Sequence, residues 1–127
     1  MIDIHCHIVP NIDDGAKNLE DALEMAKIAY SEGIRKIVNT SHYHPNFEYI
    51  NGKELFEHVR EFNDILKSNN IDIEVLLGNE LYYSEDIIEI IEQKNNFKEL
   101  LNYSTKAYKN NVAYIYKIHI HIIILII

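Results

Sequence analysis

The first 94 residues alternate between short apolar runs and longer segments in which apolar residues recur at helical spacing. The short runs predict strands at 1–4, 34–38 and 71–77, and the periodic segments predict helices at 19–30, 53–67 and about 84–93. A strand–helix alternation of this kind is typical of parallel βαβ units with right-handed crossovers. We therefore predict an α/β fold for this part of the chain.

Local start and stop signals support the first of these helices. Asn18 can serve as the N-cap, with Asp21 three residues later, and Gly33 suits the position just after the last helical turn. Ser84 is a similar N-cap candidate for the third helix.

Polar side chains follow the predicted strands at the points where these strands end. His5 and His7 come at the end of the first strand, His42 after the second and Glu80 after the third. In parallel α/β sheets, functional residues collect at the carboxyl ends of the strands. We therefore expect these four side chains to share one site.

The segment His5–Cys6–His7 is the strongest local feature. In an extended segment, residues i and i+2 point to the same face, so both imidazoles converge while the thiol points away. Two neighbouring imidazoles provide half of a site for zinc, manganese, iron or nickel. The alternative interpretation is a surface turn that carries two histidines.

Further candidate ligands follow along the chain, and several of these residues also have an ordinary explanation. Asp13 and Asp14 follow in an Asp-Asp-Gly turn, and Asp14 is the better ligand candidate, although the turn alone also explains both residues. His42 stands directly behind the second strand, whereas His44 precedes a proline and reads as a loop residue. Glu80 has a hard carboxylate oxygen that can bridge two metal ions, or it is a solvated acid.

Composition and charge limit the class of protein. The chain has 127 residues, a formal net charge of −8 and a single cysteine, Cys6. The negative charge argues against nucleic-acid binding, and one cysteine excludes an intramolecular disulfide and fits a reducing cytosol. The apolar start of the chain meets Asp3 at once and lacks the basic region of a signal peptide.

Residues 2–10 together with 13–15 resemble the opening motif of the PHP superfamily (polymerase and histidinol phosphatase). More narrowly, they resemble the manganese-dependent bacterial tyrosine-protein phosphatases of capsule and exopolysaccharide loci, the CpsB, CapC and YwqE type. The resemblance covers roughly residues 1–94 in order, through the further segments 22–29, 32–38, 40–42 and 77–81.

This resemblance implies the front portion of a distorted, TIM-like β/α barrel, incomplete in this chain, with two or three manganese ions at its mouth (iron or zinc are possible). His5 and His7 would bind one ion, Glu80 would bridge it to a second, and Asp14 and His42 would contribute to a third. The implied reaction is hydrolysis of a phosphomonoester by a metal-bound hydroxide, in which His5, His7 and Glu80 act through that hydroxide. The implied substrate is a phosphotyrosine protein in the cytoplasm, namely a tyrosine kinase of polysaccharide export.

Two other functions stay open. The chain can be another PHP phosphoesterase, such as a histidinol-phosphate phosphatase, or an inactive metal-binding remnant. Cysteine-based phosphatase chemistry is disfavoured, because the Cys-x5-Arg spacing would put an arginine where the chain has Ile12. A small core side chain is the default role of Cys6.

The pattern changes after residue 94. Residues 1–94 hold 8 basic and 19 acidic residues, whereas 95–127 hold 4 and 1, and Ile, Asn, Lys and Tyr supply 21 of these last 33 residues. The run 118–127 is too short for a transmembrane helix and predicts an aggregation-prone strand. The later family motifs, His-Pro-Glu-Arg and Asp-x-His, are absent, and His119 and His121 do not match them. We therefore expect 95–127 to be an atypical tail, produced by a frameshift or another truncation of the gene.

Overall fold

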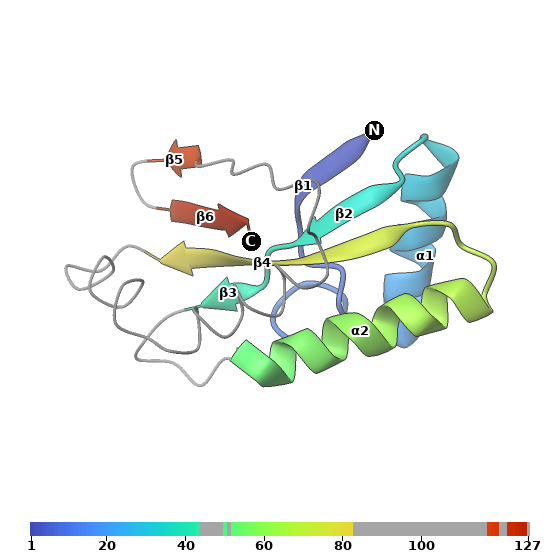
Figure 1. Cartoon of the computed structure of the whole chain (residues 1–127), viewed down its shortest axis with the longest axis horizontal. Helices are drawn as coiled ribbons and strands as arrows, with labels where there is room; N and C mark the ends of the chain where they lie inside the picture. Colours follow the sequence, from blue (N-terminus) through green and yellow to red (C-terminus); the bar gives the residue numbers. More distant parts are fainter. Residues whose placement is uncertain (44–49, 51, 83–116, 120–121, 127) are drawn as a thin grey trace, which may run out of the picture.

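The computed structural model describes residues 1–43, 50, 52–82, 117–119 and 122–126 (Figure 1). The described elements follow in chain order as β1 (Ile2–Cys6), α1 (Leu19–Ser31), β2 (Lys36–Asn39), β3 (His42–Tyr43), α2 (Gly52–Ser68), β4 (Glu74–Tyr82), β5 (Lys117–His119) and β6 (Ile122–Ile126).

The strands form a mixed sheet with β4 near its middle (Figure 1). β1, β2 and β4 pair in parallel in that order, which confirms the predicted α/β arrangement. The first half of β4 pairs with β2, and its second half pairs with β3 in parallel and with β6 in antiparallel orientation. The described strands therefore make an open sheet, and the barrel that the resemblance implies is not confirmed.

Helix α1 begins and ends where its local signals predict. The side chain of Asn18 accepts a hydrogen bond of 2.9 Å from the Asp21 N–H, and Gly33 has a φ of 87°. An N-cap side chain satisfies an N–H group that the first helical turn leaves unpaired, and glycine adopts a positive φ without steric cost. The small residues Ala22 and Ala26 are fully buried, so α1 joins the core through short side chains.

Helix α2 lies along β4 (Figure 1) and buries the apolar stripe predicted from its spacing. Leu55, Val59, Phe62 and Leu66 recur at intervals of three or four residues and are at most 5% exposed. They belong to one core cluster with the buried residues of α1 and of the strands. This core supports the sheet from which the candidate ligands project.

The observed strands differ from the predicted ones at their ends: β1 continues through His5 to Cys6, and the third predicted strand differs most. The apolar run predicts 71–77, but β4 begins at Glu74 and continues to Tyr82, so Glu80 lies inside the strand and not after it. The extension has a long-range cause. The N–H of Glu80 donates to the Ser41 carbonyl at 3.1 Å, and residues 78–82 pair with β6.

Several predictions fall wholly or partly outside the described residues. The third helix, the boundary at residue 94, His44 and His121 belong to this group, and the proposed tail origin stays a prediction. The isoleucine-rich run is extended as predicted where it is described, in the antiparallel pair β5 and β6. Neither of the two described helices is long and apolar enough to cross a membrane.

Candidate metal centre

The two histidines around Cys6 converge as the strand period predicts. His5 lies in β1 and His7 directly follows it, and their rings stack with centroids 5.6 Å apart. The Nε2 atoms of His5 and His7 lie 3.1 and 3.0 Å from the same atom, Oε2 of Glu80. Their alternation with Cys6 brings both imidazoles to a single carboxylate.

Glu80 is the centre of this arrangement. Its side chain is only 6% exposed, and Oε2 also lies 3.7 Å from Nδ1 of His42. The three histidines come from the end of β1 and the start of β3, and Glu80 comes from β4, which pairs with β3 at this point. Burial of a carboxylate is costly unless cationic or donor groups surround it, and three imidazoles provide this environment.

A tight turn after β1 carries the two aspartates. The Ala16 N–H donates to the His7 carbonyl and the Asn11 N–H to the Ala16 carbonyl, both at 3.0 Å. Gly15 lies so close to the end of β1 that a Cβ there would come within 2.2 Å of the His7 carbonyl oxygen. The absence of a side chain at Gly15 therefore permits the turn to close over His7.

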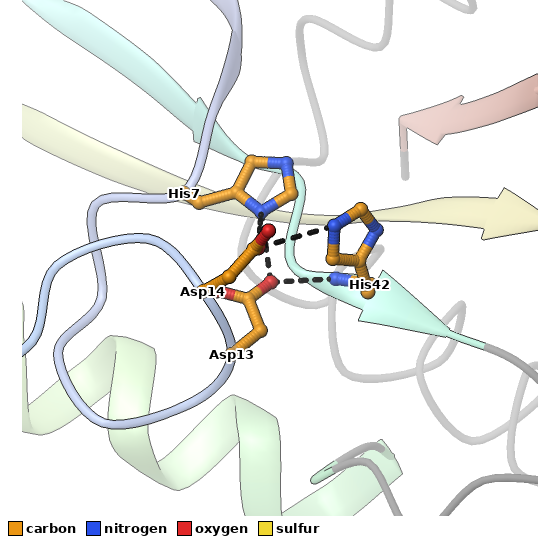
Figure 2. Close-up of side chains that lie close together, drawn as sticks. All are labelled: His7, Asp13, Asp14 and His42. Atoms are coloured by element: carbon orange, nitrogen blue, oxygen red, sulfur yellow. Dashed lines mark hydrogen bonds and ion pairs between the residues drawn. The ribbon is translucent and has the colours of Figure 1, made fainter.

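The two aspartates differ in their surroundings (Figure 2). The side chain of Asp14 is 81% exposed, and its Oδ1 lies 3.2 Å from Nε2 of His42 and 3.8 Å from Nδ1 of His7. The side chain of Asp13 is only 1% exposed, and its Oδ2 lies 2.8 Å from Nδ1 of His7 and 2.8 Å from the His42 N–H. From the sequence, Asp14 is the preferred ligand of the two, and Asp13 has no predicted role of its own. The sequence does contain a signal for the turn contact of Asp13, the Asp-x-Gly pattern at 13–15. In this pattern the aspartate often accepts a hydrogen bond from the N–H two residues later, as Asp13 does from Gly15 at 3.1 Å.

The hydrogen bonds between Asp13 and its neighbours shift the pKa values of His7 and Asp13. The hydrogen bond to Asp13 is the main cause that raises the pKa of His7 above its ordinary value, against the opposing effect of burial. Burial by itself would raise the pKa of Asp13, but the hydrogen bonds from His7, His42 and Gly15 outweigh it and lower that pKa. The contact therefore favours the ionised carboxylate of Asp13 and a proton on Nδ1 of His7.

The surroundings of Cys6, by contrast, disfavour the charged form of its side chain. Burial, with a smaller contribution from the charge of Asp3, raises the pKa of its thiol to about 11. The side chain is partly buried and packs against the core. A thiol in this state is a poor nucleophile at neutral pH, in agreement with the structural role predicted for Cys6.

Among the described residues, two groups have the composition of a metal site. They are His5, His7 and Glu80, and His7, Asp13, Asp14 and His42, and within each group the candidate ligand atoms lie within 4.8 Å of one another. Imidazole nitrogens with carboxylate oxygens suit manganese, iron and zinc. The structure thus brings all five predicted ligands, His5, His7, Asp14, His42 and Glu80, to one end of the sheet.

Comparison with known proteins places the chain in a family. The family model described as capsular polysaccharide synthesis, CpsB/CapC, matches residues 1–108. The tyrosine-protein phosphatase CpsB of Streptococcus pneumoniae is 35% identical over 94 residues, which are 74% of this chain and 39% of CpsB. The tyrosine-protein phosphatase YwqE of Bacillus subtilis is 39% identical over 110 residues, which are 85% of this chain and 41% of YwqE.

The fold of the chain also matches a solved structure of the same kind of protein. It comes from work on crystal structures of YwqE from Bacillus subtilis and CpsB from Streptococcus pneumoniae, described as unique metal-dependent tyrosine phosphatases. The match has a TM-score of 0.68 and 35% identity, and it covers 72% of this chain and 37% of the solved one. The chain spans about two fifths of the length of the curated relatives it matches. On the family model and the identity to these relatives, the chain belongs to the CpsB/CapC family of capsular polysaccharide synthesis.

Proposed function

We propose that this chain carries a metal-dependent active site that hydrolyses phosphotyrosine in proteins. The observation that carries the proposal is the convergence of His5, His7 and His42 on one buried carboxylate oxygen of Glu80. Membership of a family whose relatives are named tyrosine-protein phosphatases points to the substrate class.

The residues divide into two sets of ligands. The Nε2 atoms of His5 and His7 with the Glu80 carboxylate would hold one ion, and Asp14 with His42 would contribute to a neighbouring ion. We propose manganese, with iron and zinc as alternatives that the same donors accept. Such ions, when bound, neutralise the charge of a phosphate ester and activate water for attack on phosphorus.

The accessibility of the site is consistent with a protein substrate. The side chains of Asp14 and His5 are 81% and 43% exposed, whereas those of Glu80 and Asp13 are nearly buried. The phosphate would approach from the exposed side, where Asp14 and His5 stand. A chain with a net charge of −8 repels a phosphate dianion, so bound cations are also needed to attract it.

The partner and the location belong to the same proposal. We infer that the phosphotyrosine protein is a tyrosine kinase of polysaccharide export and that both proteins act in the cytoplasm. The family description supports the link to capsule synthesis, and the single cysteine fits a reducing compartment.

The test uses the full 127-residue chain with added manganese. Phosphate release is measured from a phosphotyrosine peptide and from histidinol phosphate, together with the number of ions bound per chain. Glu80→Gln removes the central charge, and Glu74→Gln is the matched control, since Glu74 lies on the same strand and forms an exposed ion pair with Lys36 at 2.8 Å. An exposed pair of this type contributes at most about 1 kcal/mol.

Manganese-dependent release from the peptide that is lost in Glu80→Gln and kept in Glu74→Gln supports the proposal. A clear preference for histidinol phosphate would overturn the substrate class and favour another PHP phosphoesterase. Bound ions without release from either compound would overturn the activity and favour a metal-binding remnant.

A further inference from the structure

Asp13 lies where three segments of the site meet (Figure 2). Its Oδ2 contacts Nδ1 of His7, at the end of β1, and accepts from the main-chain N–H of His42, at the start of β3, both at 2.8 Å. Its Oδ1 accepts from the Gly15 N–H at 3.1 Å, within its own turn. One carboxylate thus connects β1, the turn and β3.

These contacts leave Asp13 poorly suited to bind an ion. A carboxylate oxygen has two lone pairs, and two hydrogen bonds occupy both lone pairs of Oδ2. Oδ1 accepts a further hydrogen bond, and the whole side chain is 1% exposed. To become a ligand, Asp13 would have to release one of these donors, whereas its neighbour Asp14 is 81% exposed and faces two imidazole nitrogens.

The contact with Asp13 also determines how His7 presents its other nitrogen. Because an ionised carboxylate only accepts hydrogen bonds, the proton between them lies on Nδ1 of His7. When an ion is bound, the lone pair that faces it is then on Nε2, which lies 3.0 Å from Glu80 Oε2. Ligand histidines are commonly oriented in this way, through a carboxylate on the nitrogen that does not bind the metal.

The same oxygen restrains His42 through the main chain. Its hydrogen bond to the His42 N–H fixes the start of β3 against the turn, and the His7 and His42 rings lie edge to face with centroids 4.7 Å apart. Asp13 therefore sets the relative position of two rings that come from different strands.

We propose that Asp13 is a positioning residue of this centre: it holds His7 with Nε2 toward Glu80 and ties His42 to the turn, without binding an ion itself. The inference rests on the metal centre proposed above and assigns different tasks to two adjacent aspartates.

The experiment compares Asp13→Ala with Asp14→Ala in the full chain, with Asp13→Asn as the conservative variant. Manganese titration gives the number of ions and their affinity, and circular dichroism checks that each variant is folded. We expect Asp13→Ala to keep the number of ions and to weaken binding about 10- to 100-fold, the usual effect of removing a residue that orients a ligand. We expect Asp14→Ala to lose one ion, and Asp13→Asn, which retains one oxygen acceptor, to recover part of the affinity.

A second measurement does not depend on metal. Nitrogen-15 NMR of the imidazoles in the metal-free chain at pH 8 distinguishes a proton on Nδ1 from one on Nε2. We expect a proton on Nδ1 of His7 in the unchanged chain and, in Asp13→Ala, a shift toward the form protonated on Nε2, beside Glu80. Loss of one ion in Asp13→Ala, or an unchanged proton position on His7, would overturn the inference. If no variant binds manganese, the proposed function fails, and the NMR result still decides the role of Asp13.

Discussion

Replacing Gly15 with alanine tests whether the close approach of the turn to β1 builds the metal centre. The added Cβ would lie 2.2 Å from the His7 carbonyl oxygen and 2.4 Å from the His7 Cβ. Neither atom can rotate away. The carbonyl oxygen belongs to the main chain and accepts a hydrogen bond from the Ala16 N–H, and the Cβ is attached directly to the main chain. The conflict can be relieved only if the turn moves as a whole.

The size of the effect follows from these contacts. The shortest distance must grow from 2.2 Å to an ordinary contact of at least 3.4 Å, which stretches or breaks the Ala16–His7 hydrogen bond. Overpacking of this kind costs about 1–3 kcal/mol, and a lost hydrogen bond costs about 1 kcal/mol more. We expect Gly15→Ala to lower the free energy of unfolding by about 2–4 kcal/mol. Because Asp13 moves with the turn, we also expect manganese affinity to fall at least about tenfold.

Urea unfolding and manganese titration measure both effects, and Gly33→Ala is the control. Gly33 has a φ of 87° with nothing within 4 Å of an added Cβ, so its substitution costs about 1–2 kcal/mol of backbone strain and leaves the site untouched. The φ of Gly15 is not in the left-handed region, so strain of that kind does not apply there. A Gly15→Ala chain with unchanged stability and manganese affinity would refute the reasoning.

Three further predictions follow from other contacts. Asn63→Ala removes the amide that binds both the N–H and the C=O of Val75 at 2.8 Å on β4, so urea unfolding should show a loss of about 2–4 kcal/mol; a loss below about 0.5 kcal/mol would contradict this. In the metal-free chain, the raised pKa of His7 adds stability that is complete below pH 6.5, the ordinary histidine pKa, and that is lost as pH rises through the pKa of the folded state. The lowered pKa of Asp13 adds stability that is present above pH 3.8, the ordinary aspartate pKa, and that is lost as pH falls through the pKa of the folded state. The unfolding midpoint should therefore be higher at pH 5.5 than at pH 8, and Asp13→Asn should reduce this difference; equal slopes in both chains would count against the pairing. Cys6, with a pKa of about 11, should react with a disulfide reagent at pH 7.5 far more slowly than free cysteine, and rapid labelling of the folded chain would show that the thiol is not suppressed.

The features predicted most closely are those that short stretches of sequence determine. The start of α1 depends on Asn18 and Asp21, three residues apart, and its end on Gly33. The convergence of His5 and His7 follows from the period of a strand alone. Each of these features is a property of neighbours in the chain, so a pattern of residue types is enough to recognise it.

The position of Glu80 shows where this kind of prediction fails. Gly78 and Asn79 favour the end of a strand by their composition, and the apolar run stops before them. In the structure, Glu80 receives strand pairing from His42, 38 positions earlier, and from Ile124 in β6. The backbone partners that extend β4 come from distant segments, and no local pattern near Glu80 reveals them.

The two aspartates show the same limit in the chemistry of the site. Asp13 and Asp14 are the same residue type in the same turn, and the Asp-x-Gly spacing of Asp13 indicates only a hydrogen bond within the turn, not a contact with a ligand. Their difference arises because a main-chain N–H of His42 reaches Oδ2 of Asp13 and not Asp14. The types of metal ligand are therefore readable from sequence, whereas the groups that orient them depend on which main-chain donors the fold brings near, and those donors carry no residue type to recognise. This is why the five candidate ligands could be predicted as a group, whereas the contacts of Asp13 with His7 and His42 could not.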